Sequence, residues 1–125
     1  MNPTELDMIK QEMLSYGIEG LTEDLVPLKD TLTIISSKWN IEILTAILLG
    51  NTRFSSIKKL VPDVSDKVLM DRLKLLADEH LIIRKEEYGF PPKVEYELTE
   101  HALALYKVLH AMRDWGNEHR KICIK

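Results

Sequence analysis

Residues 65–99 read SDKVLMDRLKLLADEHLIIRKEEYGFPPKVEYELT, a helical pattern followed by a strand, a turn and a second strand. Ser65 is a favoured helix N-cap residue, and the helix it begins should end near residues 78–80. Apolar side chains recur along this helix at the spacing of one face, namely Leu69, Leu73, Leu76 and Ala77. A rotation of about 100° per residue places four other side chains on the outward face, namely Lys67, Met70, Asp71 and Lys74. This arrangement suits a recognition helix in the major groove of DNA, although an ordinary solvated helix has the same pattern.

The segment before residue 65 predicts the rest of a helix-turn-helix motif. We expect a short strand at residues 53–54 and then a brief helix that Ser55 caps and Pro62 stops. The apolar residues of this brief helix are Ile57, Leu60 and Val61. Two short helices joined by a tight turn are the elements of helix-turn-helix.

Two further helices are expected upstream. Pro27 suits the first position of a helix that runs to about Ser36, because that position needs no backbone donor. Residues 38–49 predict another helix, and Gly50-Asn51 ends it. Its apolar side carries Trp39, Ile43, Leu44, Ile47 and Leu48. These residues are expected in the core.

The end of the quoted segment predicts a β-hairpin. Residues 82–88 are strand-like, residues 89–92 form a rigid loop, and apolar and charged residues alternate over residues 93–98. A hairpin after a recognition helix is a wing, whose tip would lie along the phosphate backbone or in the minor groove. Lys93 is the expected contact, with Arg84 and Lys85 nearby on the first strand; the alternative is a hairpin that only completes the core.

The sequence predicts an amphipathic helix at each end of the chain, and the apolar face of each helix needs a packing partner. The first is short, and Gly17 and Gly20 end it; Thr99 caps the second, whose apolar arc is too broad for one packing contact. The expected dimer interface consists of Leu6, Ile9, Met13, Leu105, Leu109, Met112 and Trp115. We therefore expect a single domain over residues 1–125, mainly α with a small β-hairpin. Within this winged helix-turn-helix domain, residues 1–25 are a dimerisation arm and residues 99–120 a dimerisation helix.

Charge and composition favour an intracellular protein whose middle segment suits a polyanion. The net charge of −3 is unevenly divided: residues 1–30 hold seven acidic and two basic side chains, whereas residues 53–74 hold six basic and three acidic ones. No segment approaches the length of a membrane span, and the N-terminus does not resemble a signal peptide, so we expect a cytoplasmic protein. The lone cysteine, Cys123, cannot form an internal disulfide.

A catalytic or metal-binding function is not indicated. The four histidines are scattered, and neither a metalloprotease motif nor a glycine-rich phosphate loop is present. His119 and Cys123 are four residues apart, but two ligands are too few for a metal site, and disorder is expected at this terminus. We therefore expect no enzyme activity, no cofactor and no metal.

Several separated motifs together resemble the HxlR-type, MarR-like transcriptional regulators. The matching motifs are Ser36-Ser37-Lys38-Trp39, Arg53-Phe54-Ser55, Lys67-Val68-Leu69, Arg72-Leu73, Pro91-Pro92-Lys93-Val94-Glu95-Tyr96 and Trp115-Gly116. The resemblance covers residues 26–119 and implies a homodimer that binds double-stranded operator DNA and represses or activates neighbouring genes. The residues expected to contact DNA are Lys38, Ser55, Ser65, Lys67, Met70, Asp71, Arg72, Lys74 and Lys93.

The chain departs from the family pattern at two places. Oxidant-sensing members usually have a cysteine where this chain has Val26, so thiol sensing by that residue is excluded. Ser36-Ser37 replaces a common glycine pair. The sequence allows a small-molecule effector but does not identify one. The alternative function is a winged-helix module that binds proteins through exposed apolar anchors such as Met70 and Phe90, without direct DNA binding.

Overall fold

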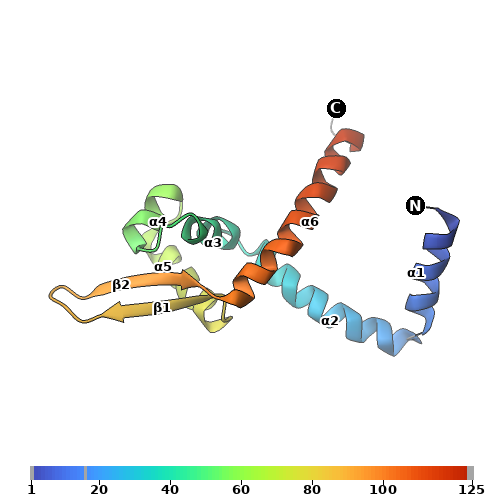
Figure 1. Ribbon diagram of the computed structural model, residues 1–125, viewed down its shortest axis with the longest axis horizontal. Helices are drawn as coiled ribbons and strands as arrows, with labels where there is room; N and C mark the ends of the chain where they lie inside the picture. Colours follow the sequence, from blue (N-terminus) through green and yellow to red (C-terminus); the bar gives the residue numbers. More distant parts are fainter. Residues whose placement is uncertain (1, 16, 124–125) are drawn as a thin grey trace. The chain divides into compact units, whose positions relative to one another are not determined.

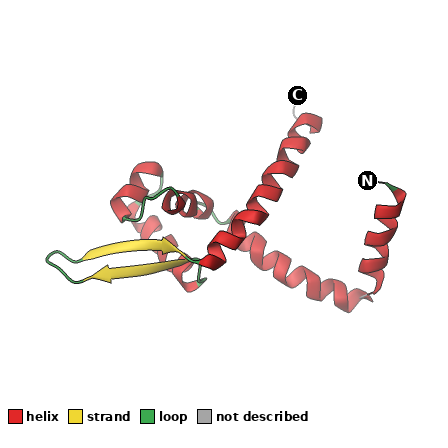
Figure 2. Cartoon of the chain, in the orientation of Figure 1, coloured by secondary structure: helices red, strands yellow, loops and turns green. Residues whose placement is uncertain are grey.

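The computed structural model describes residues 2–15 and 17–123, which are mainly helical with one two-stranded hairpin (Figures 1 and 2). The elements in chain order are α1 (Pro3–Ser15), α2 (Gly17–Ser36), α3 (Asn40–Leu48), α4 (Phe54–Leu60), α5 (Asp66–Asp78), β1 (Ile82–Glu87), β2 (Lys93–Leu98) and α6 (Glu100–Cys123). The chain divides into two compact units, Met1–Lys38 and Trp39–Lys125. No helix among the described residues is both long and apolar enough to span a membrane.

The first unit consists of α1 and α2, which contact each other. A reciprocal cap begins α1: the Glu5 amide donates to Asn2 Oδ1 at 2.8 Å, and the Asn2 amide donates to Glu5 Oε2 at 3.3 Å. The prediction that Pro27 begins a helix is wrong, because α2 already begins at Gly17 and contains Pro27. An interior proline removes one helical hydrogen bond, and Glu23, whose carbonyl would accept it, is exposed to water. The neighbouring turns therefore continue through the proline.

The second unit has a continuous apolar core. It contains the inward faces of α3 and α5 together with side chains from α4, the hairpin and the start of α6. The fully buried large residues are Ile43, Ile57, Val64, Leu69, Leu73, Leu76 and Leu81. Of the expected inward positions of α5, Leu69, Leu73 and Leu76 are thus confirmed as buried, and Ala77 is half-buried. Leu48, which was expected on the apolar side of its helix, is instead exposed.

The connections around α3 and α4 differ from the sequence-based expectation. Trp39 precedes α3 in a left-handed conformation with φ 78°, so it is not part of the helix. Gly50 follows α3 with φ 99°, a conformation that glycine adopts without strain, which confirms the predicted stop. The expected strand at residues 53–54 is absent, because Arg53 is the N-cap of α4 and Phe54 its first residue. Ser55 therefore lies inside α4 and does not cap it.

The hairpin pairs β1 and β2 in antiparallel register, with Ile82 opposite Leu98 and Glu87 opposite Lys93. In Figure 1 its loop projects beyond the helices of the second unit. The outer edge of β2 is not left entirely unpaired: the Tyr96 amide donates to the Thr52 carbonyl at 2.7 Å. This bond fixes the connection between α3 and α4 beside the second strand of the hairpin.

Thr99 joins the end of α5 to the beginning of α6. Its hydroxyl donates to the His80 carbonyl at 2.7 Å and accepts from the Ala102 amide at 3.1 Å, which confirms the predicted N-cap. Beyond Ala102, no described residue of α6 is fully buried. The helix continues to Cys123, so the expectation of disorder at that residue was wrong.

Candidate nucleic-acid interface

The turn between α4 and α5 is held by Lys58, one of the six basic side chains of residues 53–74. Lys58 Nζ donates to the Val64 carbonyl and lies 3.6 Å from Asp66 Oδ1. The amine therefore satisfies a backbone acceptor in the turn and neutralises an acid in the first turn of α5. We therefore assign Lys58 a structural role in the turn of the helix-turn-helix motif.

The outward face of α5 has the composition expected from the sequence. Ser65 caps the helix by accepting from the Val68 amide at 3.2 Å, as predicted. The four expected outward side chains are all exposed: Lys67, Met70, Asp71 and Lys74. Arg72 is half-buried at the border between this face and the core. The helix thus presents polar and cationic groups opposite an apolar face that anchors it.

The side of the hairpin near α5 adds one more cation to this surface. Arg84 and Tyr96 line a small cavity together with Met70 and Lys74 of α5. A hydrogen bond to Glu86, 3.1 Å from Arg84 Nη1, and a second to Tyr96 raise the pKa of Arg84 above its usual value. The guanidinium therefore carries its charge beside α5 at any physiological pH.

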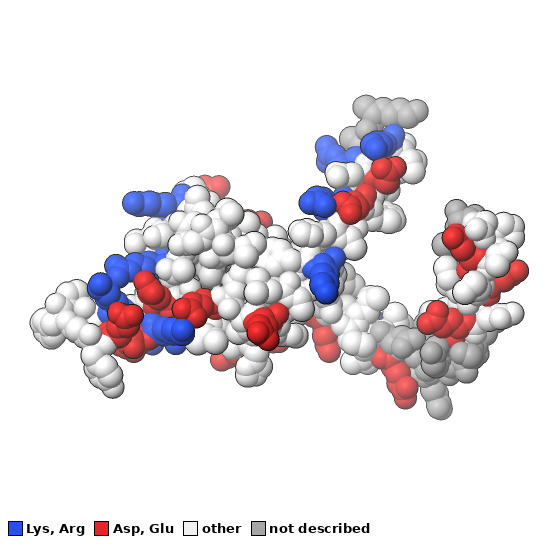
Figure 3. All heavy atoms as spheres, in the orientation of Figure 1, with Lys and Arg blue, Asp and Glu red and all other residues white. Residues whose placement is uncertain are grey.

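The wing carries more acid than base. Over residues 82–98 there are three basic and four acidic side chains, a net charge of −1. Lys85 Nζ lies 2.8 Å from Glu97 Oε2, and this hydrogen bond raises the pKa of Lys85. Figure 3 shows both signs of charge along the hairpin and an uncharged tip. Phosphate attraction at the wing must therefore come from particular side chains and not from its net charge.

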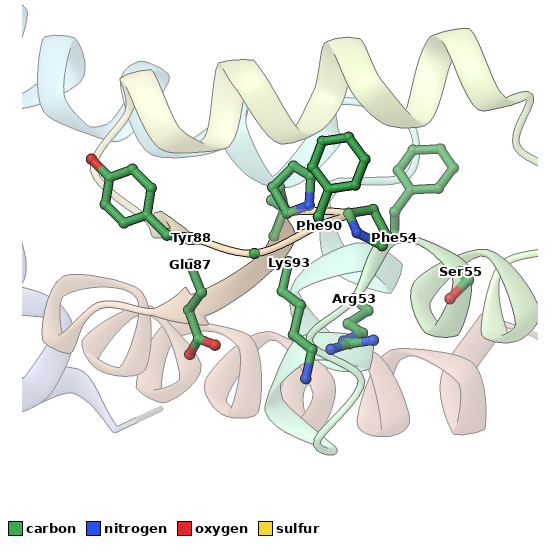
Figure 4. Close-up of a pocket in the computed structure, with 11 residues that line it drawn as sticks. Arg53, Phe54, Ser55, Glu87, Tyr88, Phe90 and Lys93 are labelled. Carbon is green, nitrogen blue, oxygen red and sulfur yellow. The ribbon is translucent and has the colours of Figure 1, made fainter.

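A groove of about 660 Å³ separates the wing from the start of α4. Its lining includes Lys93 and Ser55, which were expected to contact DNA, and Arg53, which was not in that set. In Figure 4 the charged ends of Arg53 and Lys93 point the same way, whereas the rings of Phe54 and Phe90 point the other way. The fold thus brings together residues about forty positions apart in the sequence.

Arg53 was missed because no local pattern distinguishes it from other surface arginines. Its position depends on the hydrogen bond between Thr52 and Tyr96, which pairs residues far apart in the sequence. Arg53 Nε lies 3.8 Å from Glu95 Oε1 of β2, and both side chains are partly exposed. The motif Arg53-Phe54-Ser55, which contributed to the family resemblance, was the available signal.

The remaining predicted site residues lie outside this cluster. Lys38 is exposed at the end of the first unit. The seven residues expected at a dimer interface, Leu6, Ile9, Met13, Leu105, Leu109, Met112 and Trp115, are all exposed or half-buried within the single chain. Each unit therefore presents apolar side chains that its own helices do not cover.

Three consecutive turns of α6 form a small exposed stripe near its end. The rings of Trp115 and His119 stack with centroids 4.8 Å apart, and Cys123 Sγ lies 3.8 Å from His119 Nδ1. His119 and Cys123 thus share a helix face, as their spacing suggested. Across the described residues, no group of three or more potential metal ligands is present.

Comparisons with known proteins agree with this architecture. The family model described as HxlR-like helix-turn-helix matches residues 34–122. The chain is 40% identical over 90 residues to the regulatory protein MalR of Fusobacterium mortiferum, covering 71% of this chain and 85% of the relative. The reduced form of the transcriptional regulator YodB from B. subtilis superposes with a TM-score of 0.69 at 30% identity, covering 78% of this chain and 93% of YodB.

A MarR-family transcriptional regulator from Enterococcus faecalis V583 superposes with a TM-score of 0.72 at 27% identity, covering 78% of this chain and 88% of that protein. These matches confirm the mainly helical winged fold with one antiparallel hairpin. The relatives regulate transcription and are not enzymes. The chain belongs to the HxlR-like helix-turn-helix family of transcriptional regulators.

Proposed function

We propose that the protein is a sequence-specific DNA-binding regulator that acts as a homodimer on a palindromic operator. The outward face of α5 carries the proposal: Lys67, Met70, Asp71 and Lys74 are exposed, while the opposite side is anchored in the core. Such a helix can enter the major groove without disturbing the fold that holds it. Because the proposed ligand is chromosomal DNA, we expect the protein to act in the cytoplasm.

The proposed role of each DNA-contacting residue follows from the chemistry of its side chain. Lys67 and Lys74 supply charge to phosphates or to guanine edges, and Asp71 can accept from a cytosine amino group. Ser65 uses its oxygen to cap α5, which leaves its hydroxyl hydrogen for a phosphate. Arg72, Lys38 and Ser55 complete the proposed contact set, and the wing would contact the backbone or the minor groove.

The proposed dimer rests on uncovered apolar surface at both ends of the chain. Leu6, Ile9 and Met13 are exposed along α1, and Met112 and Trp115 are exposed along α6. Leu105 and Leu109 continue the same apolar strip of α6 and are half-buried. A second copy of the chain would cover these residues, and twofold symmetry would place two recognition helices on two operator half-sites.

Substitution of Lys67 by alanine tests the recognition helix. The probe is a duplex selected from genomic fragments by the intact protein, and the measured quantity is its Kd. We expect weaker binding with an unchanged melting temperature, and a loss of about 1–3 kcal/mol with relaxed specificity at one position if Lys67 contacts a base. Lys107→Ala, an equal charge change on exposed α6, is the control. Equal affinities of the Lys67 variant and the wild type would contradict the assignment.

A protein-binding module is the second candidate function, favoured by the net acidic wing and by the full exposure of Phe90 at its tip. Salt distinguishes the two functions. Operator binding through several phosphates weakens steeply as salt rises, because neutralised phosphates release counterions. A module anchored by Met70 and Phe90 would depend on apolar contact and would show little of that dependence.

A further inference from the structure

The groove between the wing and the start of α4 gathers two cations with few local partners. Arg53 comes from the connection before α4, and Lys93 comes from the first position of β2. Within the described residues, the ion pairs include Arg53 with Glu95 but none with Lys93. Glu87 also lines the groove and lies opposite Lys93 in the hairpin register, so the groove is not simply basic.

The ion pair between Arg53 and Glu95 is long and easily exchanged. Its 3.8 Å separation joins one nitrogen to one oxygen, with 47% and 41% of the two side chains exposed. Exposed pairs of this kind contribute little to stability, because water and salt screen the two charges. A phosphate offers the guanidinium a better partner, because two parallel N–H groups of arginine match two phosphate oxygens.

The backbone around Arg53 is held in place independently of this ion pair. The Thr52 carbonyl accepts from the Tyr96 amide at 2.7 Å, and Arg53 itself is extended with φ −104° and ψ 151°. The side chain can therefore change partner while its Cα stays beside β2. Phe90, Pro91 and Pro92 form the apolar wall of the same groove, a surface suited to the deoxyribose next to a phosphate.

We infer that Arg53 and Lys93 together bind one phosphate of the operator backbone, and that Glu95 occupies Arg53 in the free protein and releases it to that phosphate. The inference rests on the proposed operator binding. It adds Arg53 to the proposed contact residues, together with a competition between Glu95 and the phosphate for the Arg53 side chain. Because the ion pair must break before Arg53 binds the phosphate, Glu95 lowers the affinity for DNA of any sequence, and a stronger ion pair would lower it further. Sequence discrimination is left to α5.

A double-mutant cycle tests this competition with the intact chain and the selected operator duplex. Arg53→Gln should weaken binding about tenfold. Arg53→Gln combined with Lys93→Gln, which removes both cations from the phosphate, should lower the slope of log K against log salt by about 0.9, the value for one phosphate. Glu95→Gln should tighten binding about two- to fivefold. In the Arg53→Gln background, the part of this gain that comes from releasing Arg53 should disappear.

Glu97→Gln is the matched control, because it removes an equal charge from the same face of β2 but from a pair with Lys85 outside the groove. We expect its small effect to be the same with Arg53 or Gln at position 53. The inference is overturned if Glu95→Gln and Glu97→Gln behave alike in both backgrounds, or if Arg53→Gln combined with Lys93→Gln leaves the salt slope unchanged. Failure of the wild type to select any duplex would instead overturn the proposed function.

Melting curves separate binding from folding. Arg53 and Glu95 are both partly exposed, so we expect each variant to melt within a few degrees of the wild type. Arg53→Lys provides a second measurement, because it keeps the charge but removes the planar fork. If Arg53→Lys binds with an affinity between those of the wild type and Arg53→Gln and keeps the wild-type salt slope, a bidentate phosphate contact is supported. If Arg53→Lys binds as weakly as Arg53→Gln and still keeps the wild-type slope, that contact is contradicted.

Discussion

The two units of the chain use apolar residues in opposite ways. Among the side chains that the structure describes, all the buried ones lie in the second unit, whose leucines and isoleucines cover one another, and none lies in the first unit. In α2, Leu28 and Val26 are both more than half exposed. Apolar side chains that stay exposed contribute little to the stability of the helices that carry them. The second unit therefore has a core of its own, whereas the apolar side chains described in the first unit are left uncovered.

The largest expected effect is a loss of unfolding free energy caused by a cavity in the core of the second unit. Leu73 is 1% exposed and Leu28 is 55% exposed, so the same truncation to alanine should separate the two units sharply. Leu73→Ala should lower the free energy of unfolding by about 2–5 kcal/mol, and Leu28→Ala by less than about 1 kcal/mol. Urea unfolding at fixed protein concentration measures both. Similar losses would show that the first unit has a core of its own.

Deletion of residues 1–16 should come next, because it removes α1 and its exposed stripe of Leu6, Ile9 and Met13. We expect the dimer Kd to rise at least about tenfold, as measured by sedimentation, with a larger loss on a two-half-site operator than on one half-site. A truncated chain that dimerises as tightly as the intact one would exclude α1 from the interface. An intact chain that is monomeric at micromolar concentration would contradict the dimer itself.

The junction between α5 and α6 should show an intermediate effect. Thr99→Ala removes the cap on the Ala102 amide and the bond to the His80 carbonyl, which should cost about 1–2 kcal/mol of unfolding free energy. Thr99→Ser keeps both bonds and serves as the control. A Thr99→Ala protein as stable as the Thr99→Ser protein would show that neither hydrogen bond contributes to folding.

A smaller effect is expected at His80, which follows α5 with φ 58°. Glycine relieves the left-handed strain but adds freedom to the unfolded chain, so His80→Gly should stabilise the protein by less than about 1 kcal/mol. His80→Val should destabilise it, because a β-branched side chain resists this conformation. Thermal unfolding of the two variants measures the difference. The opposite order of stability would show that φ at this position is not strained.

The smallest effect is expected at Cys123, which is exposed at the end of α6 and far from α5 in the sequence. Cys123→Ser should leave operator affinity unchanged, with and without diamide, because an exposed thiol at a helix end has little influence on the buried core. The measurement is the Kd of wild type and variant before and after treatment. An oxidant response that disappears in the variant would identify Cys123 as a sensor.

Local patterns predicted the parts of the fold that depend on neighbouring residues. Ser65 and Thr99 are caps as expected, because a cap is decided within a few residues, and Leu69 and Leu73 are buried at helical spacing. Pro27 was misread because the neighbouring turns of α2 continue the helix past a single proline at the loss of one hydrogen bond.

The site was predicted less completely than the core. Lys67 and Lys93 are exposed where their helix and strand patterns placed them. Arg53 was missed because its approach to Glu95 depends on the contact between two segments about forty residues apart. Lys58 is one of the six basic side chains of residues 53–74, yet its amine donates to the Val64 carbonyl, a partner that the pattern of its own helix does not identify. Composition therefore predicted the charge of this region but not the partner of each charge.

The hydrogen bond from the Tyr96 amide to Thr52 makes one proton a reporter of how the wing is attached. Tyr96 lies in β2, but its amide is bonded to the connection before α4 and not to β1. Exchange of this proton with deuterium therefore requires the hairpin to separate from that connection, even while the two strands stay paired. Its exchange rate measures the rigidity of the wing's attachment, and the amides between the strands measure the stability of the hairpin.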